Sequence, residues 1–342
     1  MPSRVKLKCV VLLILVFPVA VCPAEQDAEA EVSNQSEMAT LTEEEESVLD
    51  WHKRNVEARV QRAAQWVDAF FGDPNFDAEV ASSQLRIRPE LYYRDKQGAK
   101  IRLKGSLKLG LPNFNRKISL IVGTDSDNGT LGDSVDDSSD ESIVGLQFFG
   151  KIRNDWHLSL SAGAKFNDFA AFVGPRARYD KTLSERSSYR FTQTIRWQTN
   201  NRWQFNSRLD LNYAFNPQFL FRQTFEGRWR GEKSDKEGYR VRFSSLLTHG
   251  LKKTAGLQYE FTTIFHTQPN THVDEYIVAL RYRRRTSRDW FYYEIVPQVS
   301  FDREFDYQTN PGIRLRVEFF YGVGGIDRFK KREPEDTDNF RW

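Results

Sequence analysis

The chain has 342 residues, and its 50 lysines and arginines nearly balance its 47 aspartates and glutamates. This balance argues against a nucleic-acid-binding protein, which would carry a marked excess of positive charge. Both cysteines lie within the first 24 residues, so neither disulfides nor thiol chemistry are expected of the rest of the chain.

Residues 1–24 have the layout of a secretory signal peptide. Basic residues precede the apolar run Cys9–Val21, and the small residue Ala24 lies just before an acidic stretch. The apolar run is too short for a comfortable transmembrane helix. We expect cleavage after Ala24, which removes three of the 50 basic residues and leaves 47 basic and 47 acidic ones. Lipidation at Cys22 is the alternative, and Val21 immediately before it disfavours that outcome.

Two regions of different character follow the signal. Residues 25–41 are polar and poor in aromatic side chains, which predicts a disordered linker. In residues 42–72, Thr42 and Glu45 form a capping box, and Gly72 ends the pattern that follows. Apolar residues recur there at helical spacing: Leu49, Val56, Val60, Ala63, Val67 and Phe70. This pattern predicts one amphipathic helix.

Residues 83–322 alternate between apolar and polar side chains through segment after segment. In residues 99–110, for example, isoleucine and leucine occupy one phase, while arginine, lysine and serine occupy the other. A period of two indicates an extended strand with one apolar and one polar face. About fourteen such strands, rich in arginine on the polar face, indicate a closed barrel with its apolar face toward lipid. The predicted fold class is therefore all-β, an antiparallel transmembrane β-barrel of about 14 strands preceded by one amphipathic α-helix.

The predicted strands are 84–94, 99–110, 117–124, 142–153, 156–166, 171–180, 187–198, 202–215, 218–230, 239–249, 254–267, 275–286, 290–302 and 313–322. Short turns alternate with long polar loops, and this asymmetry places both chain ends in the periplasm. The helix at 42–72 is then periplasmic, where it packs on the barrel rim, plugs the lumen or binds a partner. Twelve strands are the alternative, because 171–180 is weakly patterned and contains Pro175.

The polar phase of these strands is rich in arginine. The predicted lumen-lining residues are Arg102, Arg178, Arg190, Arg196, Arg208, Arg222, Arg240, Arg242, Arg281, Arg314 and Arg316. Arginines around a watery pore favour anions, because cations are repelled and anionic groups find bidentate donors. We therefore predict a porin-like channel for small anionic solutes and no enzymatic activity. Two alternatives stay open: a closed structural or partner-binding barrel braced by arginine–carboxylate pairs, and a barrel hydrolase.

Three further features carry weaker signals. The spacing of His157 and Ser159 is similar to that of outer-membrane phospholipases, but the residues after the serine differ, and the phase points the pair toward the lumen. The acidic segment Thr124–Glu141 lacks the full calcium-loop pattern and is expected to be a solvated loop. The remaining histidines of the barrel fall in separate predicted turns without metal-ligand spacing: His249, His266 and His272. No metal site and no cofactor is predicted.

The signal, the alternating strands, the aromatic residues at strand ends and the aromatic last strand together resemble porin-like outer-membrane β-barrel proteins of Gram-negative bacteria. Residues 319–321, Phe-Phe-Tyr, have the aromatic character that the outer-membrane insertion machinery reads in such barrels, and the polar tail 323–342 follows them. The resemblance implies an outer-membrane location, contact with lipid and lipopolysaccharide, and assembly by that machinery. It identifies no specific family and no solute.

Overall fold

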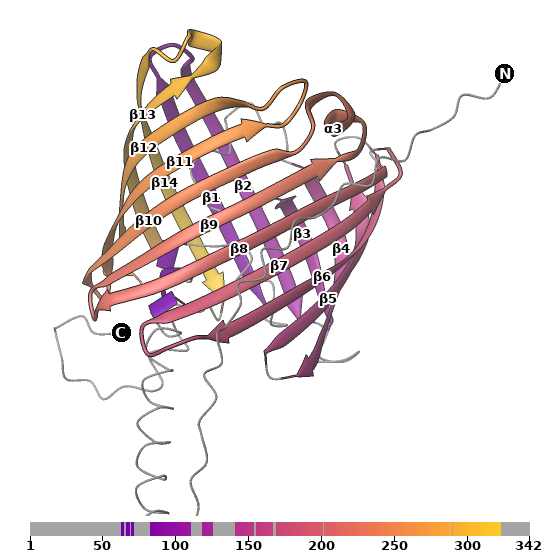
Figure 1. Cartoon of the computed structure of the whole chain (residues 1–342). Coiled ribbons are helices and arrows are strands. Elements are labelled where there is room, and N and C mark those ends of the chain that lie inside the picture. Colours follow the sequence, from indigo (N-terminus) through magenta and orange to yellow (C-terminus); the bar gives the residue numbers. More distant parts are fainter. Residues whose placement is uncertain are drawn as a thin grey trace, which may run out of the picture. The chain divides into compact units, whose positions relative to one another are not determined.

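Figure 1 presents a computed structural model of the chain. It describes residues 63, 64, 66–68, 70, 71, 83–110, 118–125, 141–153, 155–166, 169–200, 202–288 and 290–322. The predicted signal (1–24), linker (25–41) and tail (323–342) lie outside these residues. Among the described residues, no helix has the length and the apolar character needed to cross a membrane.

Fourteen antiparallel strands form one closed barrel, in which neighbours in sequence pair with each other and β1 pairs with β14 (Figure 1). The strands are β1 (Gln84–Arg94), β2 (Gly98–Gly110), β3 (Ile118–Asp125), β4 (Glu141–Arg153), β5 (Trp156–Lys165), β6 (Ala171–Thr182), β7 (Ser187–Gln198), β8 (Arg202–Asn216), β9 (Phe219–Arg230), β10 (Arg240–Lys252), β11 (Ala255–His266), β12 (His272–Arg285), β13 (Phe291–Asp302) and β14 (Thr309–Gly322). The predicted fold class and strand number are confirmed, and the twelve-strand alternative is wrong.

The strand β6 forms although it contains Pro175. Its pairing with β5 runs through the proline, which lies opposite Leu160, while its pairing with β7 skips Gly174 and Pro175. Proline has no N–H to donate, so an interruption on one side accommodates it within a sheet. A Cβ at Gly174 would lie 2.3 Å from the carbonyl oxygen of Ile195, so the close approach of the two strands requires glycine there.

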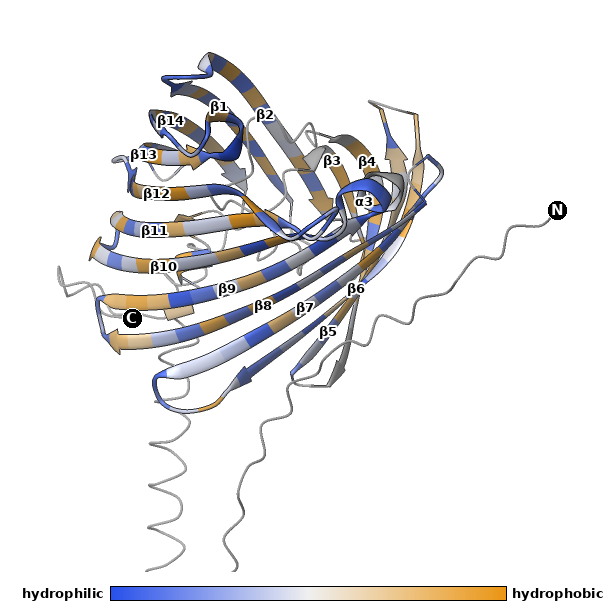
Figure 2. Ribbon diagram, turned by 45° about the horizontal axis from the view of Figure 1, so that its top comes forward, coloured by the Kyte–Doolittle hydropathy of each residue, from blue (hydrophilic) through white to orange (hydrophobic). Residues whose placement is uncertain are grey.

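The barrel is polar inside and apolar outside. Along β12, Arg281 and Arg283 are each only 2% exposed, whereas Val278, which belongs to the opposite phase of the strand, is 51% exposed. Figure 2 shows the same alternation as hydrophilic and hydrophobic bands along the strands. A soluble barrel would bury its apolar phase instead, so the outer face of this one suits hydrocarbon rather than water.

The two ends of the barrel differ in their connections. The terminal end carries the start of β1 and the end of β14, together with short connections such as 217–218 and 253–254. The loop end carries longer ones, including α3 (Gly231–Glu237) and the 3-10 turn η1 (Arg303–Phe305). A polar loop was predicted at 231–238, and the short helix there was missed because no side chain caps its N-terminus.

Seven described residues that precede the barrel are helical and buried: Ala63, Ala64, Trp66, Val67, Asp68, Phe70 and Phe71. We call them the inner segment. All of them except Asp68 pack in one apolar cluster with Leu220 of β9 and Tyr292 of β13, both in the buried phase of their strands. The end of the predicted 42–72 helix thus lies inside the terminal end of the barrel, and the rest of that helix lies outside the described residues.

Candidate functional site in the barrel lumen

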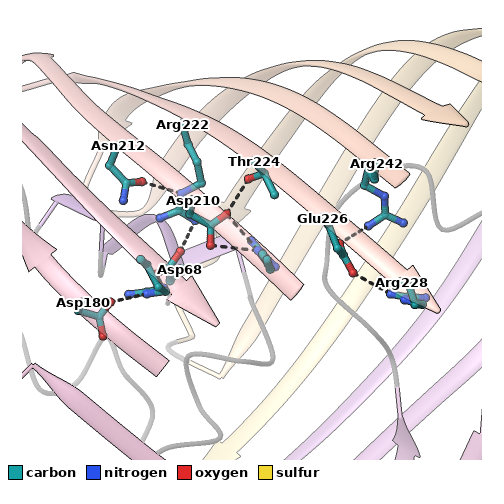
Figure 3. Close-up of polar contacts among 11 residues, drawn as sticks. Asp68, Asp180, Asp210, Asn212, Arg222, Thr224, Glu226, Arg228 and Arg242 are labelled. Carbon is teal, nitrogen blue, oxygen red and sulfur yellow. Dashed lines mark hydrogen bonds and ion pairs between the residues drawn. The ribbon is translucent and has the colours of Figure 1, made fainter. Parts of the chain in front are cut away.

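Asp68 anchors the inner segment to the β7–β9 wall (Figure 3). Its Oδ2 accepts a hydrogen bond from Arg190 at 2.7 Å, and its Oδ1 accepts one from Arg222. Burial by itself raises the pKa of Asp68, but the two guanidinium groups outweigh that effect and hold the pKa well below its usual range. The fully buried carboxylate therefore stays ionised, with its charge matched by two arginines.

The two arginines that hold Asp68 are themselves fixed by other side chains. Arg190 donates to Asp180 at 2.7 Å, and Arg178 contacts the second oxygen of Asp180 at 2.6 Å. Arg222 donates from Nε to Asn212 at 2.7 Å. Because each guanidinium is oriented from a neighbouring strand, the binding site for Asp68 is preorganised.

The ion pairs continue along the wall toward the loop end. Glu226 on β9 contacts Arg228 at 3.0 Å and Arg242 on β10 at 3.4 Å. On β8, Arg208 donates to Asp210 at 3.0 Å, and the same carboxylate accepts from a threonine hydroxyl. Figure 3 shows these contacts as one row of polar side chains across neighbouring strands. Such pairs brace the lumen.

A second charged wall lies on β1 and β12–β14. Glu294 is contacted by three arginines, at 3.6 Å by Arg281, at 3.5 Å by Arg283 and at 3.3 Å by Arg316. Arg316 also donates to Glu90 on β1 at 2.6 Å. These contacts tie the strands on either side of the β1–β14 closure to each other.

Arg283 joins this second wall to the inner segment. Its guanidinium lies 4.8 Å from the ring centroid of Tyr292 and 5.9 Å from that of Phe70. Phe70 stacks on Trp66 at 4.6 Å between centroids. The inner segment therefore contacts both walls: one through the charge of Asp68, the other through aromatic faces over a cation.

Basic side chains outnumber acidic ones in the described part of the barrel interior. Thirteen lysines and arginines are buried, against nine aspartates and glutamates, one of which is Asp68. In addition, Arg102 and Arg314 are half-buried and form no ion pair with any described carboxylate. They lie close to each other in register, since Arg102 is opposite Glu90 and Arg314 is opposite Tyr92 on the same strand.

The predicted lumen arginines differ in how far they are buried. Six are buried: Arg178, Arg208, Arg222, Arg242, Arg281 and Arg316. Five are half-buried: Arg102, Arg190, Arg196, Arg240 and Arg314. Asp68 was not predicted as the partner of Arg190 and Arg222. The sequence does place this acid beside the apolar stripe of the predicted helix.

The histidine prediction is wrong in one respect. His266 and His272 do not lie in separate turns, because β11 and β12 extend to them and pair them directly across one hairpin. His249 lies at the terminal end and stacks on Phe219, with 4.1 Å between ring centroids. His157 and Ser159 are half-buried in β5 and lie opposite Arg178 and Arg176.

Several solved structures similar to this chain are porins or outer-membrane channels. The NanC porin is 10% identical, with a TM-score of 0.36, and the match covers 68% of this chain and 98% of that one. OprD from Pseudomonas aeruginosa is 9% identical, with a TM-score of 0.41 and coverage of 71% and 94%. The channel DcaP of Acinetobacter baumannii is 8% identical, with a TM-score of 0.42 and coverage of 70% and 96%. No protein-family model and no curated protein matches the chain, and the solutes of those channels are not transferred to it.

Proposed function

We propose that this chain is a channel of the Gram-negative outer membrane that conducts small anionic solutes and is closed at its terminal end by the inner segment. The observation that carries the proposal is the excess of buried basic over acidic side chains, thirteen against nine. A net positive charge on the side chains that line a lumen attracts anions and repels cations.

Arg102 and Arg314 are the best candidates for the anion-binding groups. Most of the other predicted lumen arginines brace the barrel, because carboxylates neutralise them. Arg314 instead lies over the ring of Tyr92, 5.7 Å from its centroid, which orients the guanidinium without neutralising it. A small carboxylate or phosphate that enters the lumen finds two cationic donors on β2 and β14, the two strands that flank β1.

The location follows from the polarity of the two barrel faces. An apolar outer face with a polar interior is stable in a bilayer, and a closed barrel leaves no unpaired strand edge there. The short connections at the terminal end support a periplasmic location for both chain termini. Mature protein should fractionate with outer membranes and show heat-modifiable migration on a gel. Recovery in the soluble periplasmic fraction would contradict this location.

A closed, braced barrel without transport is the second candidate. The observation that favours it is the density of arginine–carboxylate pairs on both walls, for example around Glu294 and Glu226. The two functions differ in one measurable property. A braced barrel stays non-conducting after the inner segment is released, whereas a channel then conducts.

The test uses Asp68→Asn, which releases the inner segment, in planar bilayers with a salt gradient. In that background we expect a reversal potential that indicates anion preference. Replacing Arg102 and Arg314 by glutamine should reduce the preference, since it removes two positive charges that no described carboxylate contacts directly. Arg284→Gln is the matched control, because Arg284 is exposed on the outer phase of β12. An unchanged reversal potential in the double variant would contradict the assignment of these two residues.

A further inference from the structure

A β-bulge brings two histidines and an aspartate together at the loop end. His266 of β11 lies opposite His272 of β12, and just before this pair the register shifts so that Asp274 is an extra residue in β12. A bulge changes the phase of the strand by one residue and re-aims its side chains. Consequently His272 lies on the same face as His266, whereas an uninterrupted β12 would send it to the opposite face.

The three side chains present nitrogen and oxygen atoms to one another. His266 Nδ1 lies 2.6 Å from Asp274 Oδ2, and His272 Nε2 lies 3.2 Å from Asp274 Oδ1. One donor atom from each residue lies within 4.8 Å of the other two. In a tetrahedral zinc site, bonds of about 2.0–2.1 Å separate neighbouring ligand atoms by about 3.3 Å, so small side-chain rotations suffice to close this set on one ion.

Groups outside the cluster orient both of its imidazole rings. His272 Nδ1 lies 2.6 Å from the carbonyl oxygen of Asn270, which assigns the proton to Nδ1 and leaves the lone pair of Nε2 toward Asp274. His266 Nε2 faces Glu237 Oε2 at 3.6 Å. An imidazole that donates from one nitrogen to a carbonyl or carboxylate and coordinates with the other is the usual arrangement around protein-bound metals.

Glu237 is held in place by the backbone around it. Its carbonyl oxygen accepts a hydrogen bond from the N–H of Gln268 at 3.1 Å. The next residue, Gly238, has a φ of +74°, and a Cβ there would lie 2.3 Å from Thr267 Oγ1. Because only glycine fits this position, the end of α3 stays packed against the β11–β12 connection, beside His266.

We propose that His266, His272 and Asp274 form a binding site for Zn²⁺ at the loop end, with Glu237 orienting His266. Two imidazole nitrogens and one carboxylate are a donor set that zinc binds with a fourth position left for water. Calcium and magnesium prefer oxygen ligands only, so the two imidazoles disfavour them. The carboxylates of Asp274 and Glu237 together balance the charge of a divalent ion.

The side chains of this site are open to the aqueous phase at the loop end. Those of His266, His272 and Asp274 are 19%, 22% and 30% exposed. Binding fastens β11 to β12 at their tips and holds α3 through Glu237. The ion therefore links the β9–β10 connection, which contains α3, to the β11–β12 connection at the loop end of the barrel.

Isothermal titration of the full, untagged protein in detergent micelles with zinc chloride tests this site. We expect one ion per chain in the wild type and loss of binding in the double variant His266→Ala/His272→Ala. His249→Ala is the control, since that histidine stacks on Phe219 at the other end of the barrel. Glu237→Gln should keep the stoichiometry and weaken binding about 10-fold to 100-fold, because it removes only the orienting group.

A wild-type protein that binds no zinc would overturn the proposal, as would a double variant that binds it unchanged. Heat-modifiable migration on a gel reports whether the double variant is folded. If it is not, the wild type loaded with Cu²⁺ gives a second measurement. Nitrogen hyperfine coupling in its electron paramagnetic resonance spectrum supports the site, and absence of that coupling refutes it.

Discussion

The two ends of this barrel are held together by different contacts. At the terminal end, the apolar inner segment lies in the lumen and is fastened by one carboxylate, that of Asp68, between two arginines. At the loop end, described connections pack against one another through polar contacts such as the hydrogen bond from Tyr307 Oη to the carbonyl of Val273 at 2.5 Å. The contacts at the terminal end depend on a few side chains of one helical segment, and those at the loop end depend on the strands and the connections that join them.

Because of this difference, opening of the channel and stability of the barrel should depend on opposite ends of the molecule. A segment that precedes the barrel can leave the lumen without breaking a strand–strand hydrogen bond. The loop-end contacts, in contrast, break only if the hairpins are distorted. We therefore expect changes at the terminal end to alter conductance and changes at the loop end to alter unfolding.

The largest effect is expected from Asp68→Asn. The substitution leaves Arg190 and Arg222 buried without their shared carboxylate, and removing one partner of a buried ion pair costs about 3–5 kcal/mol. Docking of the inner segment should weaken by roughly two to four orders of magnitude, which single-channel recording reports as frequent open events. Asp306→Asn makes the same chemical change at an exposed loop-end position and should leave recordings at the wild-type level.

Gly256→Val should also displace the inner segment, but less completely. A Cβ at Gly256 would lie 3.1 Å from Phe71 and 3.3 Å from Trp66, so a larger side chain crowds both rings. Overpacking of this kind costs about 1–3 kcal/mol. Open events should rise above the wild-type level and stay below that of Asp68→Asn. Gly227→Val is the control, since a Cβ at Gly227 meets nothing within 4 Å, and equal opening by both variants would contradict the contact.

A smaller effect is expected from Tyr307→Phe at the loop end. It removes the hydrogen bond to Val273, which contributes about 1 kcal/mol, and leaves the ring in place. The free energy of unfolding in urea should fall by about that amount, while conductance stays the same. Tyr239→Phe serves as the comparison, because the hydroxyl of Tyr239 has no hydrogen-bond partner among the described residues. A rise in conductance for Tyr307→Phe would break the contrast between the two ends.

The smallest effect is expected from mild acid. The folded-state pKa of Asp68 lies below the ordinary aspartate value of about 3.9, because the two arginines outweigh burial. Its contribution to docking is therefore fully present above that ordinary value and is lost only as the pH falls through the lower, folded-state pKa. Lowering the pH from 7 to about 5 should leave the frequency of open events unchanged. More frequent opening of the channel at the lower pH would show that the Asp68 carboxyl group is not kept ionised by the two arginines.

The strands and their faces could be predicted because a period of two directly encodes the side on which each residue lies. The apolar phase of residues 99–110 needs no knowledge of the partner strand, and the same holds for residues 202–215. Partners in the lumen could not be predicted in this way. Arg316 meets Glu90 only because the barrel closes between β14 and β1 at a particular register.

Two features escaped prediction for local reasons. Alternation assigns His272 to the outer phase of β12, and only the bulge at Asp274, which has no composition signal, reverses that assignment. Asp68 belongs to a helix whose pattern identified an apolar face but not what that face packs against. Its partners, Arg190 and Arg222, lie more than a hundred residues along the chain.

The proposed channel has a cation-lined lumen that the inner segment closes, and removal of that segment tests both properties at once. Conductance and reversal potential of the full chain are compared with those of a chain that lacks residues 25–81, in planar bilayers under the same salt gradient. We expect the full chain to be mostly closed, and the shortened chain to insert, conduct steadily and prefer anions. A shortened chain that inserts and stays closed, or that prefers cations, would contradict the proposal.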